Sequence, residues 1–158
     1  MNESRVRISK VKPEKAEPKA SDKSSREMAL LAAAAAYDKK ASDIIIQEVR
    51  EKLLICDYFV IVTGANKRQI DAICDAVEDS LRESAGVKPL GREGLRELDW
   101  VLLDYGELVV HVFQPEVREF YRLETLWNDS PLLDPAEAGI EDPVYSERIL
   151  KLLENPTV

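Results

Sequence analysis

The feature that most constrains the fold is a nearly continuous apolar run from Tyr58 to Thr63 (YFVIVT), which Gly64 follows. β-Branched and aromatic residues favour extended backbone, and an apolar run without polar alternation is typical of a strand buried on both faces. Such a strand needs covering elements on both sides of its sheet. The rest of the chain is therefore expected to supply further strands and flanking helices.

Two helices are predicted around this strand. The first begins at Ser24 or Ser25 and runs to about residue 40, with alanines that permit close packing. The second begins after Asn66 and ends near Gly86. In the second helix, residue 69 is a glutamine as in a capping box, and an apolar stripe follows at helical spacing: Ile70, Ile73, Val77 and Leu81.

Three more strands and a third helix follow from the pattern. Residues 43–49 form one predicted strand, and residues 100–104 and 107–113 form a predicted hairpin. Pro115 suits the first position of a short helix that runs past Phe120 and Tyr121 towards Trp127. This order indicates an α/β domain with a mixed β-sheet and flanking helices.

The hairpin divides its side chains between two faces. With a two-residue turn at 105–106, Leu102 lies opposite Val109 and Trp100 opposite His111. One face is purely aliphatic and is expected to join the core. The other face gathers Trp100, Leu102, Asp104, Glu107, Val109, His111 and Phe113.

Charge and composition divide the chain into three parts. Residues 1–24 carry a net charge of +3, lack apolar periodicity, and are predicted to be a disordered tail. Residues 25–133, with a net charge of −7, form the α/β domain, and residues 134–158, with −4, form an acidic extension. Phosphates repel an acidic body, so direct binding of RNA or DNA is disfavoured and a basic protein partner is favoured.

Several function classes find little support. No apolar run approaches the roughly 20 residues of a membrane helix, and no signal peptide is visible, so the expected location is the cytoplasm. Cys56 and Cys74 stand among apolar neighbours and are expected to be reduced core residues. With His111 as the sole histidine, a zinc site lacks ligands, and no cofactor is expected.

Three features of the sequence suggest catalysis, and each has a simpler interpretation. His111 lies in an apolar strand without a nucleophile motif, so a buried structural role or a partner contact is favoured over a catalytic base. Asp104 and Glu107 flank the turn and serve either turn chemistry or contact with a basic partner. The strand–glycine–helix order at residues 58–86 also suggests a nucleotidyltransferase. The later strand, however, lacks the paired carboxylates that hold its metal.

Six aromatic residues remain, gathered between residues 100 and 127 among acidic neighbours. Aromatics usually build cores, but interface hot spots also favour Trp and Tyr inside a polar rim. Few basic residues accompany these rings, which disfavours stacking on RNA. The group predicts a protein-docking surface and comprises Trp100, Tyr105, Phe113, Phe120, Tyr121 and Trp127.

An ordered series of motifs resembles the ribosomal silencing factor family, also called the RsfS or Iojap family. The resemblance spans about residues 25–133 and leaves both tails outside it. Its most specific part runs from WVLLDYG at residue 100 to LW at residue 126. The series includes Lys39-Lys40-Ala41, Asp57-Tyr58-Phe59-Val60-Ile61, Thr63-Gly64, Arg68-Gln69, Glu93-Gly94, Val109-Val110-His111-Val112-Phe113, Glu116, Arg118, Phe120-Tyr121 and Leu123-Glu124.

The resemblance implies a nucleotidyltransferase-like fold without catalytic carboxylates and a non-enzymatic role. It implies binding to the large ribosomal subunit through its fourteenth protein, which blocks joining of the small subunit and represses translation when nutrients are scarce. Relatives in organelles act in large-subunit assembly, which is the alternative role, and members also form homodimers. We expect Asp104 and Glu116 to belong to a charged rim around the partner contact. The residues expected to contact the partner are Trp100, Leu102, Asp104, Tyr105, His111, Phe113, Glu116, Tyr121 and Trp127.

Overall fold

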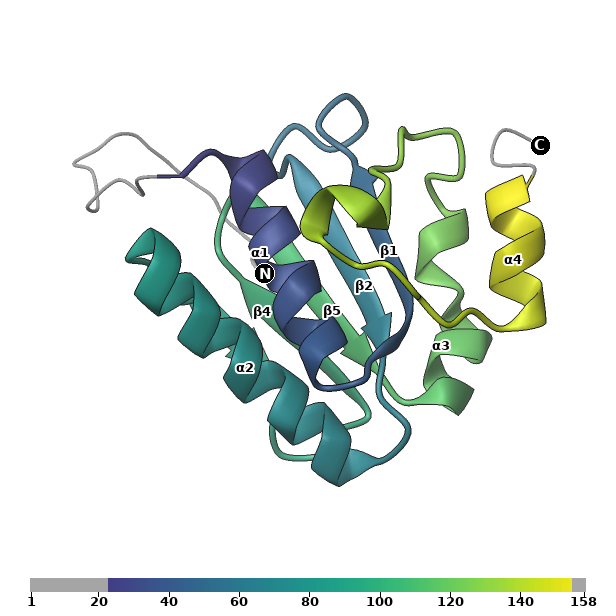
Figure 1. Cartoon of the computed structure of the whole chain (residues 1–158), viewed down its shortest axis with the longest axis horizontal. Coiled ribbons are helices and arrows are strands. Elements are labelled where there is room, and N and C mark those ends of the chain that lie inside the picture. The colour runs from purple at the N-terminus through teal and green to yellow at the C-terminus, as the bar shows by residue number, and fades with distance from the viewer. Residues whose placement is uncertain (1–22, 155–158) are drawn as a thin grey trace.

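The predicted buried strand lies inside a five-stranded sheet in the computed structural model, which describes residues 23–154 (Figure 1). All six of its residues are buried. The spatial order is β1-β2-β5-β4-β3; β2 and β5 run parallel, and the other neighbouring pairs are antiparallel. The predicted mixed α/β sheet is confirmed, whereas the nucleotidyltransferase likeness stays a prediction. The strands are β1 (Ser42–Glu48), β2 (Tyr58–Thr63), β3 (Gly91–Glu93), β4 (Trp100–Asp104) and β5 (Leu108–Phe113).

Two helices, α1 (Ser25–Asp38) and α2 (Lys67–Ala85), cover one face of the sheet, the face towards the viewer in Figure 1. Ser24 begins α1 with both hydrogen bonds of a capping box, as Glu27 completes the pair. The side chains that α1 buries are mostly small, so the helix approaches its neighbours closely. Those without exposed surface are Ala29, Ala32, Ala33 and Ala36.

The predicted limits of α2 are confirmed, with one change at its start. The Asn66 side chain accepts from the Gln69 N–H at 2.9 Å, and Gly86 ends the helix in the left-handed conformation. The Gln69 side chain reaches the N–H of Ala65 instead of that of Asn66. Its amide group also donates to the carbonyl of Lys39 at 2.8 Å, which ties the start of α2 to the end of α1.

The opposite face is covered by α3 (Pro115–Tyr121), a 3₁₀ turn at Leu123–Thr125 called η1, and α4 (Glu147–Glu154). The predicted run of α3 towards Trp127 is wrong, because Arg122 takes a left-handed conformation (φ 48°) and ends the helix. These elements enclose a second core, whose buried members include Ile45, Phe59, Ile61, Phe113, Leu123 and Ile149.

The C-terminal segment wraps around the β1 edge of the sheet. The Glu48 N–H donates to the Pro131 carbonyl at 2.8 Å, and the Leu133 N–H donates to the Ile46 carbonyl at 2.9 Å. Ile140 then enters the first core, before α4 enters the second. The sequence boundary at residue 133 is therefore not a packing boundary. The predicted disordered tail lies, up to residue 22, outside the described residues.

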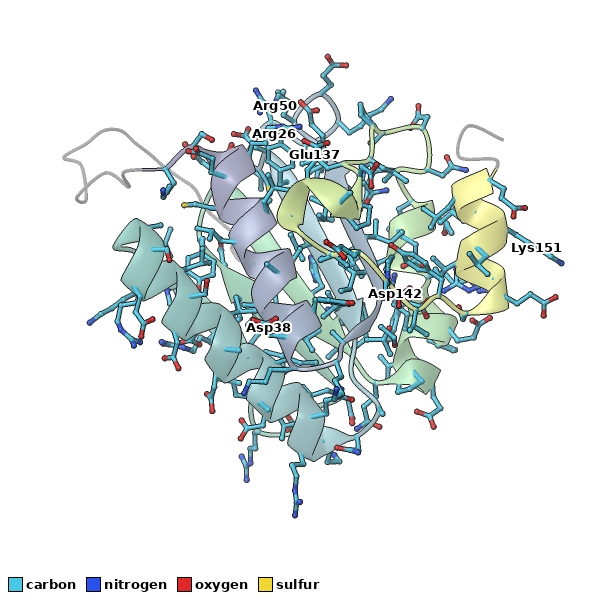
Figure 2. All side chains as sticks on the ribbon, in the orientation of Figure 1. Arg26, Asp38, Arg50, Glu137, Asp142 and Lys151 are labelled. Atoms are coloured by element: carbon cyan, nitrogen blue, oxygen red, sulfur yellow. The ribbon has the colours of Figure 1, made fainter. Side chains whose placement is uncertain are left out.

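A short 3₁₀ helix, η2 (Pro135–Ala138), fastens the beginning of this segment to α1. Glu137 of η2 forms an ion pair with Arg26 of α1, and Figure 2 shows the two side chains near each other. Both side chains are partly exposed, so the pair contributes little to stability and mainly marks where the segment crosses α1.

The β4–β5 hairpin is paired two residues away from the predicted register. Leu102 lies opposite His111, and Trp100 lies opposite Phe113, where Val109 and His111 were predicted. A shift of two residues leaves every side chain on its predicted face, because side chains alternate with period two. The predicted division into an aliphatic and a mixed face is therefore confirmed, whereas the predicted pairing is wrong.

The turn of this hairpin explains the shift. The Tyr105 N–H donates to the Leu108 carbonyl at 2.8 Å, so Tyr105 extends the ladder and the two turn residues are Gly106 and Glu107. Gly106 has φ +87°, a conformation that glycine adopts without steric cost. Tyr105 is only 8% exposed and packs in the first core, on the α1–α2 side.

The β3–β4 connection passes so close to β4 at Gly94 that a side chain there would overlap the backbone of β4. This close contact can be tested through its effect on stability. A Cβ on Gly94 would lie 2.0 Å from the Trp100 carbonyl oxygen, and φ there is +86°. Gly94→Ala should lower the free energy of unfolding by about 3 kcal/mol or more, because overlap with backbone adds to the φ penalty. The measurement is urea denaturation followed by circular dichroism.

Gly86→Ala is the matched control, since Gly86 has φ +69° and nothing within 4 Å of its Cβ position. It should cost only about 1–2 kcal/mol. Equal losses for the two variants would contradict the close packing of Gly94 on β4.

Candidate protein-docking site

The mixed face of β4 is only partly covered. Val101 and Leu103 are fully buried, whereas the residues between and beside them are partly exposed. Leu102 stands between His111 of β5 and Glu93 of β3, and it is a member of neither core. Apolar side chains that stay accessible to solvent on the face of a sheet are suited to contact with a protein partner. We call this surface the open face and define it by Glu93, Trp100, Leu102, Asp104 and Val109.

Trp100 joins the open face to the second core. Its ring stacks on Phe113 with 4.7 Å between centroids, and the centroid of the Tyr121 ring of α3 lies 5.0 Å away. Tyr121 is 52% exposed and contacts Phe120, which is 78% exposed. The aromatic residues of β4 and α3 thus form one row that begins in the core and ends in solvent.

His111 lies on the buried side of Trp100 and accepts a hydrogen bond from it. The indole Nε1–H of Trp100 donates to His111 Nδ1 at 3.1 Å, so Nε2 carries the proton of the neutral ring. Phe59 meets the His111 ring in a T-shaped arrangement, with 4.7 Å between ring centroids. Burial, with a smaller effect of the nearby Arg118 charge, lowers the pKa of His111 to about 3. A neutral, buried ring fits the structural role that the sequence allowed for His111.

A buried ion network holds α3 in place. Arg118 Nε donates to Glu124 Oε1 at 2.8 Å, and Arg118 Nη1 donates to Thr63 Oγ1 at 2.9 Å. Arg148 of α4 adds an ion pair to Glu124 at 2.7 Å and another to Glu119 at 2.8 Å. Burial lowers the pKa of Arg118, and the Glu124 charge opposes that shift. Removing one partner of such a buried pair leaves an uncompensated buried charge, so the network ties α3 to β2 and to α4.

Sequence reasoning missed this network, although Arg118 and Glu124 both stand in the quoted motifs. The residues that complete it lie on β2 and α4, far along the chain, so no local spacing reports it. The only available signal was the presence of a charged pair inside an otherwise apolar and aromatic segment.

The remaining predicted site residues fall in different places. Asp104 Oδ1 accepts from the Gly106 N–H at 2.8 Å, which is turn chemistry at the end of the open face. Glu116 is exposed in the first turn of α3. Trp127 packs on Phe59 with 5.4 Å between ring centroids, in the second core, while Tyr105 lies on the opposite side of the sheet.

The structure thus brings six of the nine predicted site residues together and leaves three outside that group. Neighbours on or directly beneath the open face are Trp100, Leu102, Asp104, His111, Phe113 and Tyr121. Tyr105 lies on the other side of the sheet, Trp127 is connected to His111 through Phe59, and Glu116 is exposed in the first turn of α3.

Neither a metal centre nor a membrane span is found within residues 23–154. No group of three or more His, Cys, Asp or Glu in that range has a metal-binding arrangement, and none of its helices combines the length and apolar character of a membrane span. Cys56 and Cys74 are free and buried, as expected for core thiols, and burial raises the pKa of each to about 12.

Comparison with known proteins decides the family. The family model described as "Ribosomal silencing factor during starvation" matches residues 22–149. The chain belongs to this family. The match extends beyond the span of the sequence resemblance and includes the segment that wraps around β1. The silencing-factor family therefore includes most of the described fold.

Individual relatives agree with that assignment. A ribosomal silencing factor of Bacillus subtilis is 42% identical over 104 residues, which are 66% of this chain and 87% of the relative. A crystal structure of a Chromobacterium violaceum protein is 32% identical with a TM-score of 0.64, covering 78% of this chain and 93% of that one. A mouse relative named mitochondrial assembly of ribosomal large subunit protein 1 is 33% identical over 94 residues, 56% of this chain and 40% of the relative.

The buried imidazole generates a pH prediction for this silencing-factor domain. Between the folded pKa of about 3 and the unfolded value of about 6.5, the unfolded chain binds one more proton at His111. The free energy of unfolding should therefore fall as pH drops below about 6.5, by up to ~1.4 kcal/mol per pH unit from this group. His111→Gln keeps an acceptor for Trp100 and removes the titration, so its stability should fall less steeply.

Denaturation of both proteins between pH 5 and 8 gives the comparison, because the carboxylates contribute equally to the two curves. Parallel stability curves for the wild type and His111→Gln would show that His111 is not held neutral in the fold.

Proposed function

We propose that this protein is a non-enzymatic silencing factor that docks on the large ribosomal subunit through the open face and thereby blocks joining of the small subunit. The proposed contact on the ribosome is its fourteenth large-subunit protein, and the proposed occasion is nutrient limitation. Membership of the silencing-factor family supports the role. The partly exposed Leu102, outside both cores and beside an exposed aromatic row, is the observation that carries the docking surface.

Blocking subunit joining requires only that the factor binds tightly and fills the contact surface, and it does not require a chemical step. A bound factor occupies a contact that the other subunit needs, so the fraction of withheld subunits follows from its concentration and dissociation constant. A folded domain held rigid by two cores suits this task, because it loses little conformational freedom on binding.

Charge on the open face favours a basic protein partner. Its apolar centre is bordered by Glu93 and Asp104 and, beyond them, by Glu107 and Glu116. The nearby Arg92 points to the other side of the sheet, where it forms a bidentate contact with Glu78 of α2 at 2.8 Å. The border therefore stays negative, and complementary potentials speed and orient docking on a positive surface.

This geometry supports a set of proposed contact residues. Trp100, Leu102 and Tyr121 form the apolar centre, and Asp104 and Glu116 belong to the charged rim. His111 and Phe113 support Trp100 from the buried side. Tyr105 is left out of the proposed contact because it is buried on the other side of the sheet, and Trp127 because its ring packs on Phe59 of β2, which β5 separates from β4.

Large-subunit assembly is the second candidate function, and the name of the mouse relative favours it. An assembly factor shares the ribosomal partner but acts before the mature subunit exists. Binding to assembly intermediates and free ribosomal protein, without binding to mature subunits, would select that role.

A charge placed at the centre of the open face tests the docking surface. Leu102→Glu should weaken binding to purified large subunits at least tenfold, because the new carboxylate must be desolvated against apolar groups. Asp104→Asn keeps the acceptor for the Gly106 N–H and removes only the charge, so it should weaken binding modestly and flatten its salt dependence. Co-sedimentation across a salt series provides both readings.

Leu150→Glu is the control, since Leu150 is an exposed apolar residue on α4, away from the open face. It should bind like the wild type, and all three variants should keep the wild-type circular dichroism. Full binding by a folded Leu102→Glu variant would remove the open face from the proposed interface.

A further inference from the structure

The connection between β1 and β2 carries two adjacent apolar side chains in solvent. Leu54 is 93% exposed and Ile55 is 75% exposed, the largest exposure of neighbouring apolar residues in the described chain. Figure 1 shows this connection protruding at the top of the molecule, and Arg50, labelled in Figure 2, lies at its beginning. Single exposed apolar residues are ordinary, but an adjacent pair on a protruding loop suits a binding anchor.

Both flanks of the loop are anchored, so the pair has a defined position. Before it, the Leu53 N–H donates to the Val49 carbonyl at 2.7 Å, and Leu53 packs against the second core. After it, Cys56 is buried and its thiol donates to the Tyr58 carbonyl at 3.2 Å. The tip is thus held in place from both sides.

The same contacts place the tip beside the open face. The Asp57 N–H donates to the Glu107 carbonyl at 2.9 Å, which joins the loop to the β4–β5 turn. On the other side, Lys52 pairs with Asp129 at 3.0 Å, next to the segment that carries Trp127. The loop therefore stands at the end of the sheet where Asp104 closes the open face.

Charge around the tip is negative once internal pairs are counted. Arg50 pairs with Glu48 at 3.1 Å and lies over the Tyr58 ring, while Lys52 is paired with Asp129. Glu51 and Glu107 remain at the surface beside these pairs. Anionic membranes and nucleic acids both attract basic surfaces, so this border favours a basic protein.

We infer that Leu54 and Ile55 form a second apolar anchor of the docking site, which inserts into an apolar pocket on the same basic protein that covers the open face. This inference rests on the proposed function. The first anchor, Trp100 with Tyr121, lies at the α3 end of β4, and the second lies at the Asp104 end. Two anchors at opposite ends fix the direction in which the partner lies along β4, which a single apolar centre does not.

The test uses the full chain carrying Leu54→Asp and Ile55→Asp together, with Val144→Asp as the matched control. Val144 is 68% exposed and lies at the opposite end of β1, where its carbonyl accepts from the Asp43 N–H. Binding to purified large subunits is measured by co-sedimentation. The double variant should bind at least tenfold more weakly, the control should bind like the wild type, and both should keep the wild-type melting temperature.

A conservative double variant, Leu54→Met with Ile55→Val, should retain binding because it keeps the apolar surface. Undiminished binding by the aspartate variant, while the wild type binds, overturns the second anchor and leaves the proposed function standing. Loss of self-association in sedimentation equilibrium, with ribosome binding intact, also overturns it by assigning the tip to a second copy of the chain. A wild type that binds no large subunits overturns both proposals.

Discussion

Side chains alternate along a β-strand, and the two faces of this sheet receive unequal cover. The α1–α2 face is closed, with fully buried aliphatic residues on β4 and β5. The other face is closed by α3, η1 and α4, but the cover leaves Leu102 partly exposed outside both cores. The Arg118–Glu124 pair ties α3 to β2 through Thr63, and the Tyr121 ring of the same helix lies beside Trp100. The open face is the surface that results.

Features that depend on residues close together in the sequence could be predicted. The apolar run of β2, the Asn66 and Gly86 limits of α2 and the aliphatic face of β4 and β5 all depend on neighbours a few residues apart. The strand pairing could not, because a shift of two residues preserves the alternation on which the prediction relied.

Features that depend on distant parts of the chain were likewise missed. The wrapping of the C-terminal segment around β1 leaves only weak amphipathic signals, and the network around Arg118 draws on β2, α3 and α4. Within the candidate site, Trp100, Leu102 and Tyr121 were predicted from residue type and alternation, and the structure places the Trp100 and Tyr121 rings side by side. The placement of Tyr105 was not predicted, because it follows from the turn that shifts to Gly106–Glu107.

The most direct measurement of the proposed occlusion is subunit joining itself. Purified large and small subunits are mixed at a magnesium concentration that promotes association, with and without the protein, and resolved on a sucrose gradient. Steric silencing predicts that joined ribosomes disappear as the protein is added, and that the protein sediments only with the large subunit. Undiminished joining while the protein stays bound to the large subunit would contradict occlusion and select the assembly role.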